Sequence, residues 1–142
     1  MFSSSRAPFV WPVRVYYEDT DSGGVVYYAN YLKFMERARS EWLRAHGFEP
    51  AALVKEHHLM FAVVRLTVEY RRPARLGDLL EVGVKLLASR RASIEFLQDV
   101  THASLSPELL CRAHVKVACV DAVTLRPRSI PSFIASELAL ER

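Results

Sequence analysis

The chain has 142 residues, of which 51% are hydrophobic and 25% are charged, and its formal net charge is +3. This length suits one domain with its own core, and the composition is that of an ordinary globular protein. No apolar run approaches the eighteen or so residues that a membrane span needs, and no block of basic residues favours nucleic acid. We therefore expect one domain over residues 1–142, without a membrane span or a nucleic-acid partner.

The N-terminal residues 1–8 contain three serines and an arginine but no apolar segment. A secretory signal requires such a segment, so we interpret the protein as cytoplasmic. Cys111 and Cys119 are the only cysteines. If one strand joins them, their Cα atoms lie about 26 Å apart, far beyond the reach of a disulfide. We expect two small buried side chains with no catalytic or metal-binding role.

The first predicted element is a short strand over residues 13–16, where apolar and polar side chains alternate. An acidic turn with two aspartates and two glycines follows over residues 17–24. Apolar residues then recur at steps of three and four, which predicts a long amphipathic helix that starts around Val26 to Tyr28 and stops at Gly47. Its apolar face contains Tyr31, Leu32, Phe34, Met35, Ala38, Trp42 and Ala45.

The rest of the chain is dominated by the alternation that is typical of β-strands. Pro50 could open a short helix that ends near His57 and His58, which we interpret as solvated because no metal ligand lies beside them at suitable spacing. We predict four antiparallel strands over residues 61–70, 80–86, 94–100 and 111–119, and a last short helix capped by Ser132. On the first of these strands, one face should contain Val64, Leu66, Val68 and Tyr70. One helix on one antiparallel sheet is an α+β arrangement.

The acidic turn places a carboxylate a few residues before the long helix. No Ser, Thr, Asp or Asn lies just ahead of Tyr28 as a cap, so the first N–H groups of the helix would be free to bind a developing negative charge. Asp21 could attack a carbonyl carbon or activate a water, and the two glycines would let the backbone turn sharply. The simpler interpretation is that both aspartates only form the turn and that Asn30 caps a helix starting three residues later.

This region resembles the signature of the hotdog-fold acyl-CoA thioesterases, in the branch of the 4-hydroxybenzoyl-CoA thioesterases and the Tol–Pal-associated thioesterases. The resemblance covers nearly the whole chain in order. The matching residues are Tyr17, Thr20, Asp21, Gly24, Val26, Tyr27, Asn30, Tyr31, Leu32 and Glu36 to Arg39, followed downstream by Tyr70 to Ala74, Gly77, Asp78, Arg126, Pro127, Ile130 and Pro131.

The resemblance implies a hotdog fold, in which an antiparallel sheet of about five strands wraps around one central helix. It implies hydrolysis of a short-chain or aromatic acyl-CoA, with no metal or separate cofactor because CoA is part of the substrate. Asp21 falls on the catalytic aspartate of the branch, and Gly24 lies in the turn that leaves room for the thioester. Tyr28 falls on the position whose backbone N–H binds the thioester oxygen, where many Tol–Pal-associated relatives carry histidine. The family also implies a homodimer or homotetramer with active sites between subunits.

Other assignments fit these residues less well. A calcium-binding EF-hand loop starting at Asp19 would have glycine at its fifth position and Asn30 at its twelfth, where a bidentate glutamate belongs. Other hotdog thioesterases use a glutamate on the central helix, here Glu36, but Arg37 and Arg39 beside it favour an ion pair. A hotdog dehydratase would need a His–acid pair, and no histidine has that context. A non-catalytic acyl-CoA-binding or scaffold protein and a thioesterase acting on acyl carrier protein stay open as alternatives.

The phosphates of the coenzyme require cationic side chains at the mouth of the site. Ser89, Arg90 and Arg91 lie in the predicted turn between two strands and are the candidates for this contact. The alternative is that both arginines are solvated turn residues. Further candidates are Arg71, Arg72 and Arg75.

Overall fold

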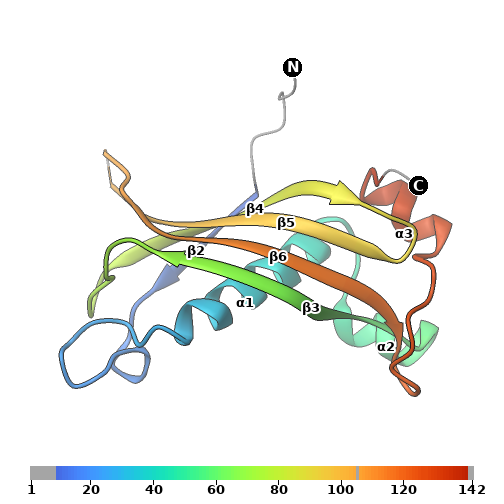
Figure 1. Cartoon of the computed structure of the whole chain (residues 1–142), viewed down its shortest axis with the longest axis horizontal. Coiled ribbons are helices and arrows are strands. Elements are labelled where there is room, and N and C mark those ends of the chain that lie inside the picture. The colour runs from blue at the N-terminus through green and yellow to red at the C-terminus, as the bar shows by residue number, and fades with distance from the viewer. Residues whose placement is uncertain (1–8, 105, 141–142) are drawn as a thin grey trace.

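The computed structural model describes residues 9–104 and 106–140, which form one antiparallel sheet wrapped around a long helix (Figure 1). The strands lie in the order β2-β4-β5-β6-β3 across the sheet. They are β2 (Phe9–Arg14), β3 (Leu59–Tyr70), β4 (Leu79–Ser89), β5 (Ser93–His102) and β6 (Leu109–Asp121). The helices are α1 (Asn30–Ala45), α2 (Pro50–His57) and α3 (Ser132–Glu137), with a single 3-10 turn, η1 (Tyr17–Asp19). This arrangement confirms the predicted α+β architecture of five strands and one central helix.

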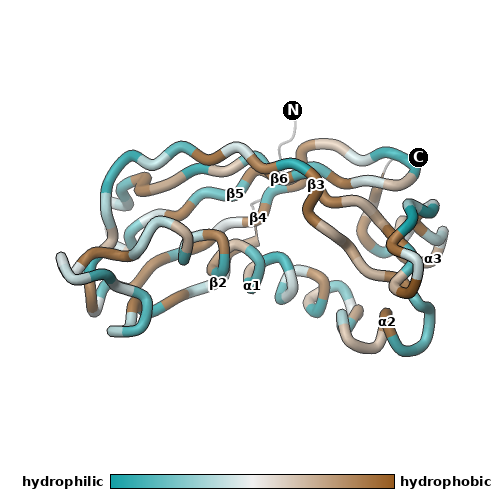
Figure 2. Tube along the Cα trace, turned by 60° about the horizontal axis from the view of Figure 1, so that its bottom comes forward, coloured by the Kyte–Doolittle hydropathy of each residue, from teal (hydrophilic) through white to brown (hydrophobic). Residues whose placement is uncertain are grey.

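Helix α1 lies against the concave face of the sheet (Figure 2). Its buried residues follow the predicted three- and four-residue steps, and they pack on the inward-facing residues of the strands. The alternation predicted for β4, β5 and β6 is also confirmed, because every second residue through most of these strands is buried. Within residues 9–104 and 106–140, no helix is both long and apolar enough to cross a membrane.

One buried amide joins α1 to the sheet. Gln98 on β5 is fully buried, and its Nε2 donates to the backbone oxygens of Met35 at 3.0 Å and Gly83 at 3.3 Å. Its Oε1 accepts a hydrogen bond from Nη1 of Arg39 at 2.9 Å. Buried polar groups without partners are costly, so this set of bonds favours one position of α1 along the sheet.

Several predicted boundaries are wrong for reasons that lie in local hydrogen bonds. The first strand covers Phe9–Arg14 and not residues 13–16, because Oδ2 of Asp19 accepts the Tyr16 N–H at 2.8 Å and turns the chain into η1. Helix α1 begins at Asn30 and not around Val26 to Tyr28, because Val26 pairs instead with the loop after β3. Ser132 is the first residue of α3, whose N-cap is Pro131 without a side-chain cap.

Strand β3 contains a bulge that the alternating pattern does not predict. Val63 pairs with Val117 and Arg65 pairs with Lys116, so Val64 is the extra residue. A bulge resets the alternation of side chains between the two faces. Val63 therefore shares the concave face with Leu66, and the prediction that Val64 does so is wrong.

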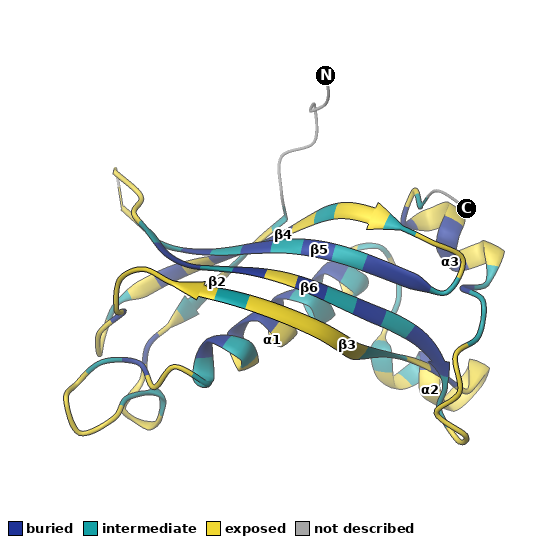
Figure 3. Cartoon of the chain, viewed as in Figure 1, coloured by how far each residue is buried: buried dark blue, intermediate teal, exposed yellow. Residues whose placement is uncertain are grey.

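Strand β3 is also the least covered strand of the sheet, as the exposed residues in Figure 3 show. Helix α1 packs mainly on β4 and β2, at the other side of the sheet. Apolar side chains on the concave face of β3 consequently keep much of their surface in water: Val63 is 48% exposed, Leu66 37% and Tyr70 46%. Since β3 is an edge strand, its outer backbone groups have no partner strand within the described chain.

Replacing Gln98 with alanine should lower the free energy of unfolding by about 2–3 kcal/mol, because it leaves a small cavity and removes the bond that satisfies Arg39. Urea denaturation followed by circular dichroism measures the change. Lys33→Ala, on the exposed face of the same helix, should change the value by less than about 0.5 kcal/mol. Equal losses in the two variants would contradict the special role of Gln98.

Candidate active site

The acidic turn is held together by its own backbone and by one carboxylate. Thr20 and Val26 form an isolated bridge, and the Asp21 N–H donates to the Val25 oxygen at 2.9 Å. Oδ1 of Asp21 accepts the Gly23 N–H at 2.8 Å, which fixes the direction of the carboxylate. Gly24 has a φ of +79°, a left-handed conformation that favours glycine. The Asp21 side chain is exposed in the isolated subunit.

The loop between β3 and β4 holds this turn against the sheet. Val26 donates its N–H to the Ala74 oxygen at 2.9 Å, and Val25 forms an isolated bridge with Arg75. The hydroxyl of buried Tyr31 accepts the Ala74 N–H at 3.0 Å. The position of the acidic turn therefore depends on contacts with residues about fifty positions later in the chain.

The start of α1 (the helix entrance) matches neither prediction, a helix that begins around Val26 to Tyr28 or a helix capped by Asn30. The helix starts at Asn30, yet Asn30 does not cap it: Nδ2 donates to the Asp19 oxygen at 2.9 Å, and no side chain caps the first turn. Among the described residues, the N–H of Tyr28 donates to no acceptor. The Tyr28 N–H therefore lies just before the helix and is available to an external oxygen.

Tyrosine side chains surround this entrance. The rings of Tyr27 and Tyr28 lie 4.8 Å apart, and the ring of Tyr70 stands edge-on to that of Tyr28 at 6.1 Å. The Tyr70 hydroxyl donates to the Tyr28 oxygen at 3.0 Å. The sequence predicted Tyr70 as a strand residue and as part of the family resemblance but not as a partner of Tyr28, because no local pattern connects two residues 42 positions apart.

An apolar cavity of about 310 Å³ lies between α1, α2 and the sheet. Its polar lining comes from one turn of α1. The lining residues are Glu36, Arg39, Ser40, Trp42, Leu43, Pro50, Ala51, Leu53, Val54, Leu59, Met60, Phe61, Ile94, Phe96 and Val117. Such a space suits an apolar group of a ligand.

Glu36, the runner-up for the catalytic acid, lines this cavity. Its Oε2 accepts a hydrogen bond from the Ser40 hydroxyl at 2.6 Å. The ion pair predicted with Arg37 or Arg39 is wrong, since neither arginine forms one with Glu36 in the described part of the chain, and Arg39 bonds to Gln98. Burial lowers the pKa of the Arg39 guanidinium, although the nearby Glu36 charge opposes this shift.

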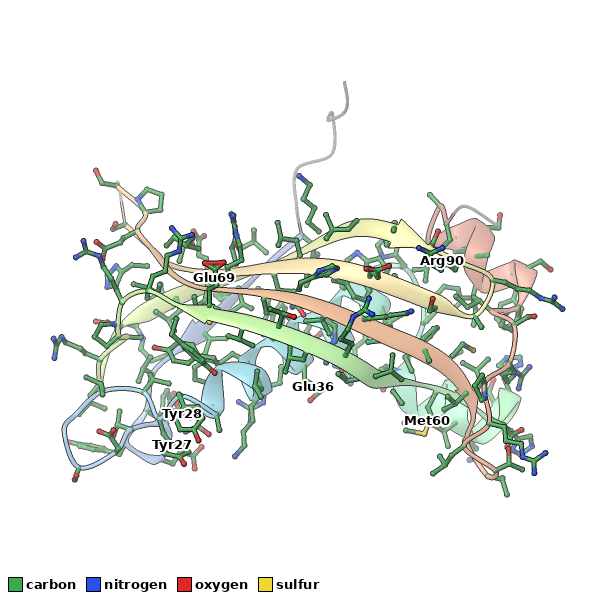
Figure 4. All side chains as sticks on the ribbon, viewed as in Figure 1. Tyr27, Tyr28, Glu36, Met60, Glu69 and Arg90 are labelled. Atoms are coloured by element: carbon green, nitrogen blue, oxygen red, sulfur yellow. The ribbon has the colours of Figure 1, made fainter. Side chains whose placement is uncertain are left out.

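The proposed phosphate-binding turn lies far from Asp21 within one subunit. Figure 4 places Arg90 at one end of the sheet and Tyr28 at the other. Nε of Arg90 lies 4.0 Å from Oε2 of Glu95, and Nε of Arg91 donates to the Ser129 hydroxyl at 2.7 Å. Ser89 is the last residue of β4. A single subunit therefore has Asp21, Gly24 and Tyr28 in one short segment and keeps residues 89–91 apart from Tyr28.

Away from the acidic turn, two histidines lie beside acids: Nε2 of His114 is 2.9 Å from Oε1 of Glu95, and Nε2 of His102 is 3.5 Å from Oδ1 of Asp78. Over the described ranges, no group of three or more His, Cys, Asp or Glu residues could hold a metal ion. Cys111 and Cys119 are both buried and unpaired, as predicted. Burial raises the pKa of the Cys111 thiol to about 12, so this thiol stays protonated and unreactive at neutral pH.

The acidic turn and the helix entrance together have the parts that acyl transfer requires. A carboxylate can add to a carbonyl carbon or take a proton from water. A backbone N–H without an acceptor can bind the oxyanion that then develops. The hydrogen bond to Gly23 leaves the second carboxylate oxygen of Asp21 free for this chemistry within the described chain.

Comparisons with a family model and with known proteins all lead to thioesterases. Residues 15–138 match the model of the thioesterase-like superfamily. The acyl-CoA thioester hydrolase YbgC of Escherichia coli is 49% identical over 129 residues, which cover 91% of this chain and 94% of that protein. The acyl-CoA thioesterase YbgC of Haemophilus influenzae is 46% identical over 123 residues, covering 87% and 88%.

Solved structures support the same architecture. A probable thioesterase from Bartonella henselae is 34% identical, with a TM-score of 0.82 and coverage of 88% of this chain and 100% of that one. The 1,4-dihydroxy-2-naphthoyl-CoA thioesterase Slr0204 from Synechocystis is 22% identical, with a TM-score of 0.84 and coverage of 94% and 96%. The second likeness concerns the fold alone, and it confirms the hotdog arrangement predicted from the sequence.

Proposed function

This chain belongs to the thioesterase-like superfamily and is an acyl-CoA thioester hydrolase, and we propose that Asp21 is its catalytic carboxylate and that the Tyr28 N–H binds the thioester oxygen. The observation that carries this proposal is the turn itself. It presents an acid, fixed by the Gly23 N–H, beside a helix entrance whose Tyr28 N–H has no acceptor in the described chain.

Hydrolysis then follows one of two routes. Asp21 either adds to the thioester carbon, forming an anhydride that water later cleaves, or removes a proton from a water that adds to the same carbon. In both routes the carbonyl oxygen gains negative charge, which the Tyr28 N–H stabilises. The carbon–sulfur bond breaks, the CoA thiolate takes up a proton, and the acyl group leaves as the free acid.

We infer that the acyl group enters the apolar cavity of a second copy of the chain. Asp21 and Tyr28 are exposed on the isolated subunit, and catalysis by a carboxylate is favoured where water is excluded. The exposed β3 edge offers a way to cover them, because two such edges can pair antiparallel across a twofold axis. Pairing about the midpoint of β3 would place Tyr70 of one subunit opposite the partner subunit's Leu59 and next to the partner's Met60, and both of these residues line the cavity.

The same pairing would bring the separated parts of the site to one end of the dimer. Arg90 and Met60 lie at the same end of the subunit, opposite Tyr28 (Figure 4). In the paired sheet, the partner's Arg90 would then lie at the end where Asp21 lies, about 10–15 Å from the seam at strand spacings of about 4.8 Å. A coenzyme could extend over this distance with its phosphates at the arginines. The favoured acyl group is a short-chain or aromatic one, and acyl carrier protein is the alternative thiol carrier.

Asp21→Asn should reduce turnover of acyl-CoA by roughly three orders of magnitude or more, because the amide can neither attack nor accept a proton. Release of free thiol from a panel of acyl-CoAs measures this, with circular dichroism to check the fold. Asp19→Asn is the matched control, since the Asp19 carboxylate accepts the Tyr16 N–H and an amide oxygen can still do so. Near-normal turnover in folded Asp21→Asn would refute the assignment and turn attention to Glu36.

Replacing Arg90 and Arg91 together with alanine should raise the KM for an acyl-CoA about five- to tenfold and weaken its dependence on salt, because two cations that face the phosphates are lost. Steady-state kinetics at several ionic strengths measures both effects. A small thioester without phosphates is the control and should be hydrolysed as before. Equal losses on both substrates would count against phosphate binding.

The protein should have at least twice the chain mass at low micromolar concentration, measured by sedimentation or light scattering. Val63→Asp should yield an inactive monomer, because pairing of β3 edges would bury an unpaired carboxylate at the seam. Lys85→Asp, a charge change on the interior strand β4, should leave the mass unchanged. An active monomer of the unaltered chain would rule out both the quaternary proposal and the shared site.

A further inference from the structure

We propose that Tyr70 is a positioning residue for the reaction, which holds the peptide after Tyr28 so that the Tyr28 N–H faces the thioester oxygen. The inference rests on the proposed role of Tyr28. It adds a residue from the edge strand β3 to a site that otherwise consists of the acidic turn and the helix entrance.

The Tyr70 hydroxyl makes a defined hydrogen bond, and the Tyr70 ring packs against a buried neighbour. Tyr70 is the last residue of β3, and its hydroxyl donates to the Tyr28 oxygen at 3.0 Å. Its ring also stands edge-on to Tyr31 at 5.7 Å. Tyr31 is 3% exposed and is itself fixed by the Ala74 N–H. The Tyr70 ring therefore rests on an immobile neighbour while its hydroxyl reaches the helix entrance.

The helix entrance depends on this bond because it has few others. Tyr28 is 61% exposed and lies outside any helix or strand. Its neighbours are held by two backbone bonds, from the Tyr27 N–H to the Asp19 oxygen and from the Asn30 N–H to the Tyr27 oxygen. In the part of the chain that the structure describes, the Tyr70 hydroxyl is the one donor to the Tyr28 oxygen.

Peptide geometry connects this bond to the oxyanion donor. Two planar peptides meet at Tyr28. The preceding one carries the Tyr28 N–H, and its oxygen accepts the Asn30 N–H at 2.8 Å. The following one is held through its oxygen by Tyr70, so the two bonds together limit rotation about the Tyr28 backbone. Burial raises the pKa of the Tyr70 phenol above its ordinary value, so the hydroxyl keeps its proton and remains a donor at neutral pH.

The test compares Tyr70→Phe with a replacement that keeps a donor. Tyr70→Phe should lower kcat about two- to tenfold, the effect of one lost hydrogen bond of about 0.5–1.4 kcal/mol. The KM should stay the same, because the bond acts on the oxyanion and not on binding of the coenzyme. The loss should be equal for acyl-CoAs and for a phosphate-free thioester. Tyr70→4-aminophenylalanine, which presents an N–H donor at the same place, should restore most of kcat.

Tyr16→Phe is the matched control, since it removes the hydroxyl of a tyrosine that is 63% exposed and lies before the acidic turn, and it should leave kcat unchanged. Unaltered kcat in Tyr70→Phe would overturn the proposal. A loss of kcat that 4-aminophenylalanine does not restore would also overturn the proposal. The same holds for a loss of kcat that is accompanied by dissociation of the dimer. If Asp21→Asn is inactive while Tyr70→Phe is fully active, only the role of Tyr70 fails. If Asp21→Asn is active, the proposed function itself fails.

Discussion

One helix is too narrow to cover the concave face of a five-stranded sheet. Five strands span about 19 Å at spacings of about 4.8 Å, whereas a helix with its side chains is about 10 Å across. Helix α1 packs on β4 and β2, and the uncovered side falls on β3. The exposed apolar residues of β3, the exposed acidic turn and the cavity beside β3 all follow from this mismatch in width. The subunit is thus complete as a fold, yet it leaves the edge strand β3 and the acidic turn open to water.

The Gln98 amide links α1 to the β4 side of the sheet, away from the uncovered strand β3. By bonding to Met35 and Gly83 at once, it draws α1 toward the β4 side of the sheet. It also holds Arg39, whose partly buried charge would otherwise have no polar partner from the sheet. A polar residue at a core position usually costs stability. Here its cost is offset by three hydrogen bonds, and the gain is a defined placement of the helix that enters the site.

The features of the fold that could be predicted from the sequence depend on neighbours within a few positions. Apolar residues recur at three- and four-residue spacing from Tyr31 to Trp42, and apolar and polar residues alternate in β4 to β6. Both patterns reflect which side chains are buried, and both predicted elements were confirmed. The start of α1, the bulge at Val64 and the contact of Tyr70 with Tyr28 depend on partners far away in the chain. For the same reason, local patterns could identify Asp21 in a glycine turn but could not reveal that Arg90 lies at the opposite end of the subunit.

The bulge in β3 has a consequence for which chains can pair with this edge. Val64 lies next to the midpoint of a strand that covers Leu59–Tyr70, so two copies paired about a twofold axis would bring their irregular segments face to face. A regular strand from an unrelated protein would meet a kinked and more strongly twisted backbone there and would lose bonds on one side of it. A shift by one residue would also move the two irregular segments out of alignment. A bulged edge of this kind therefore resists the open-ended strand addition that leads to aggregates.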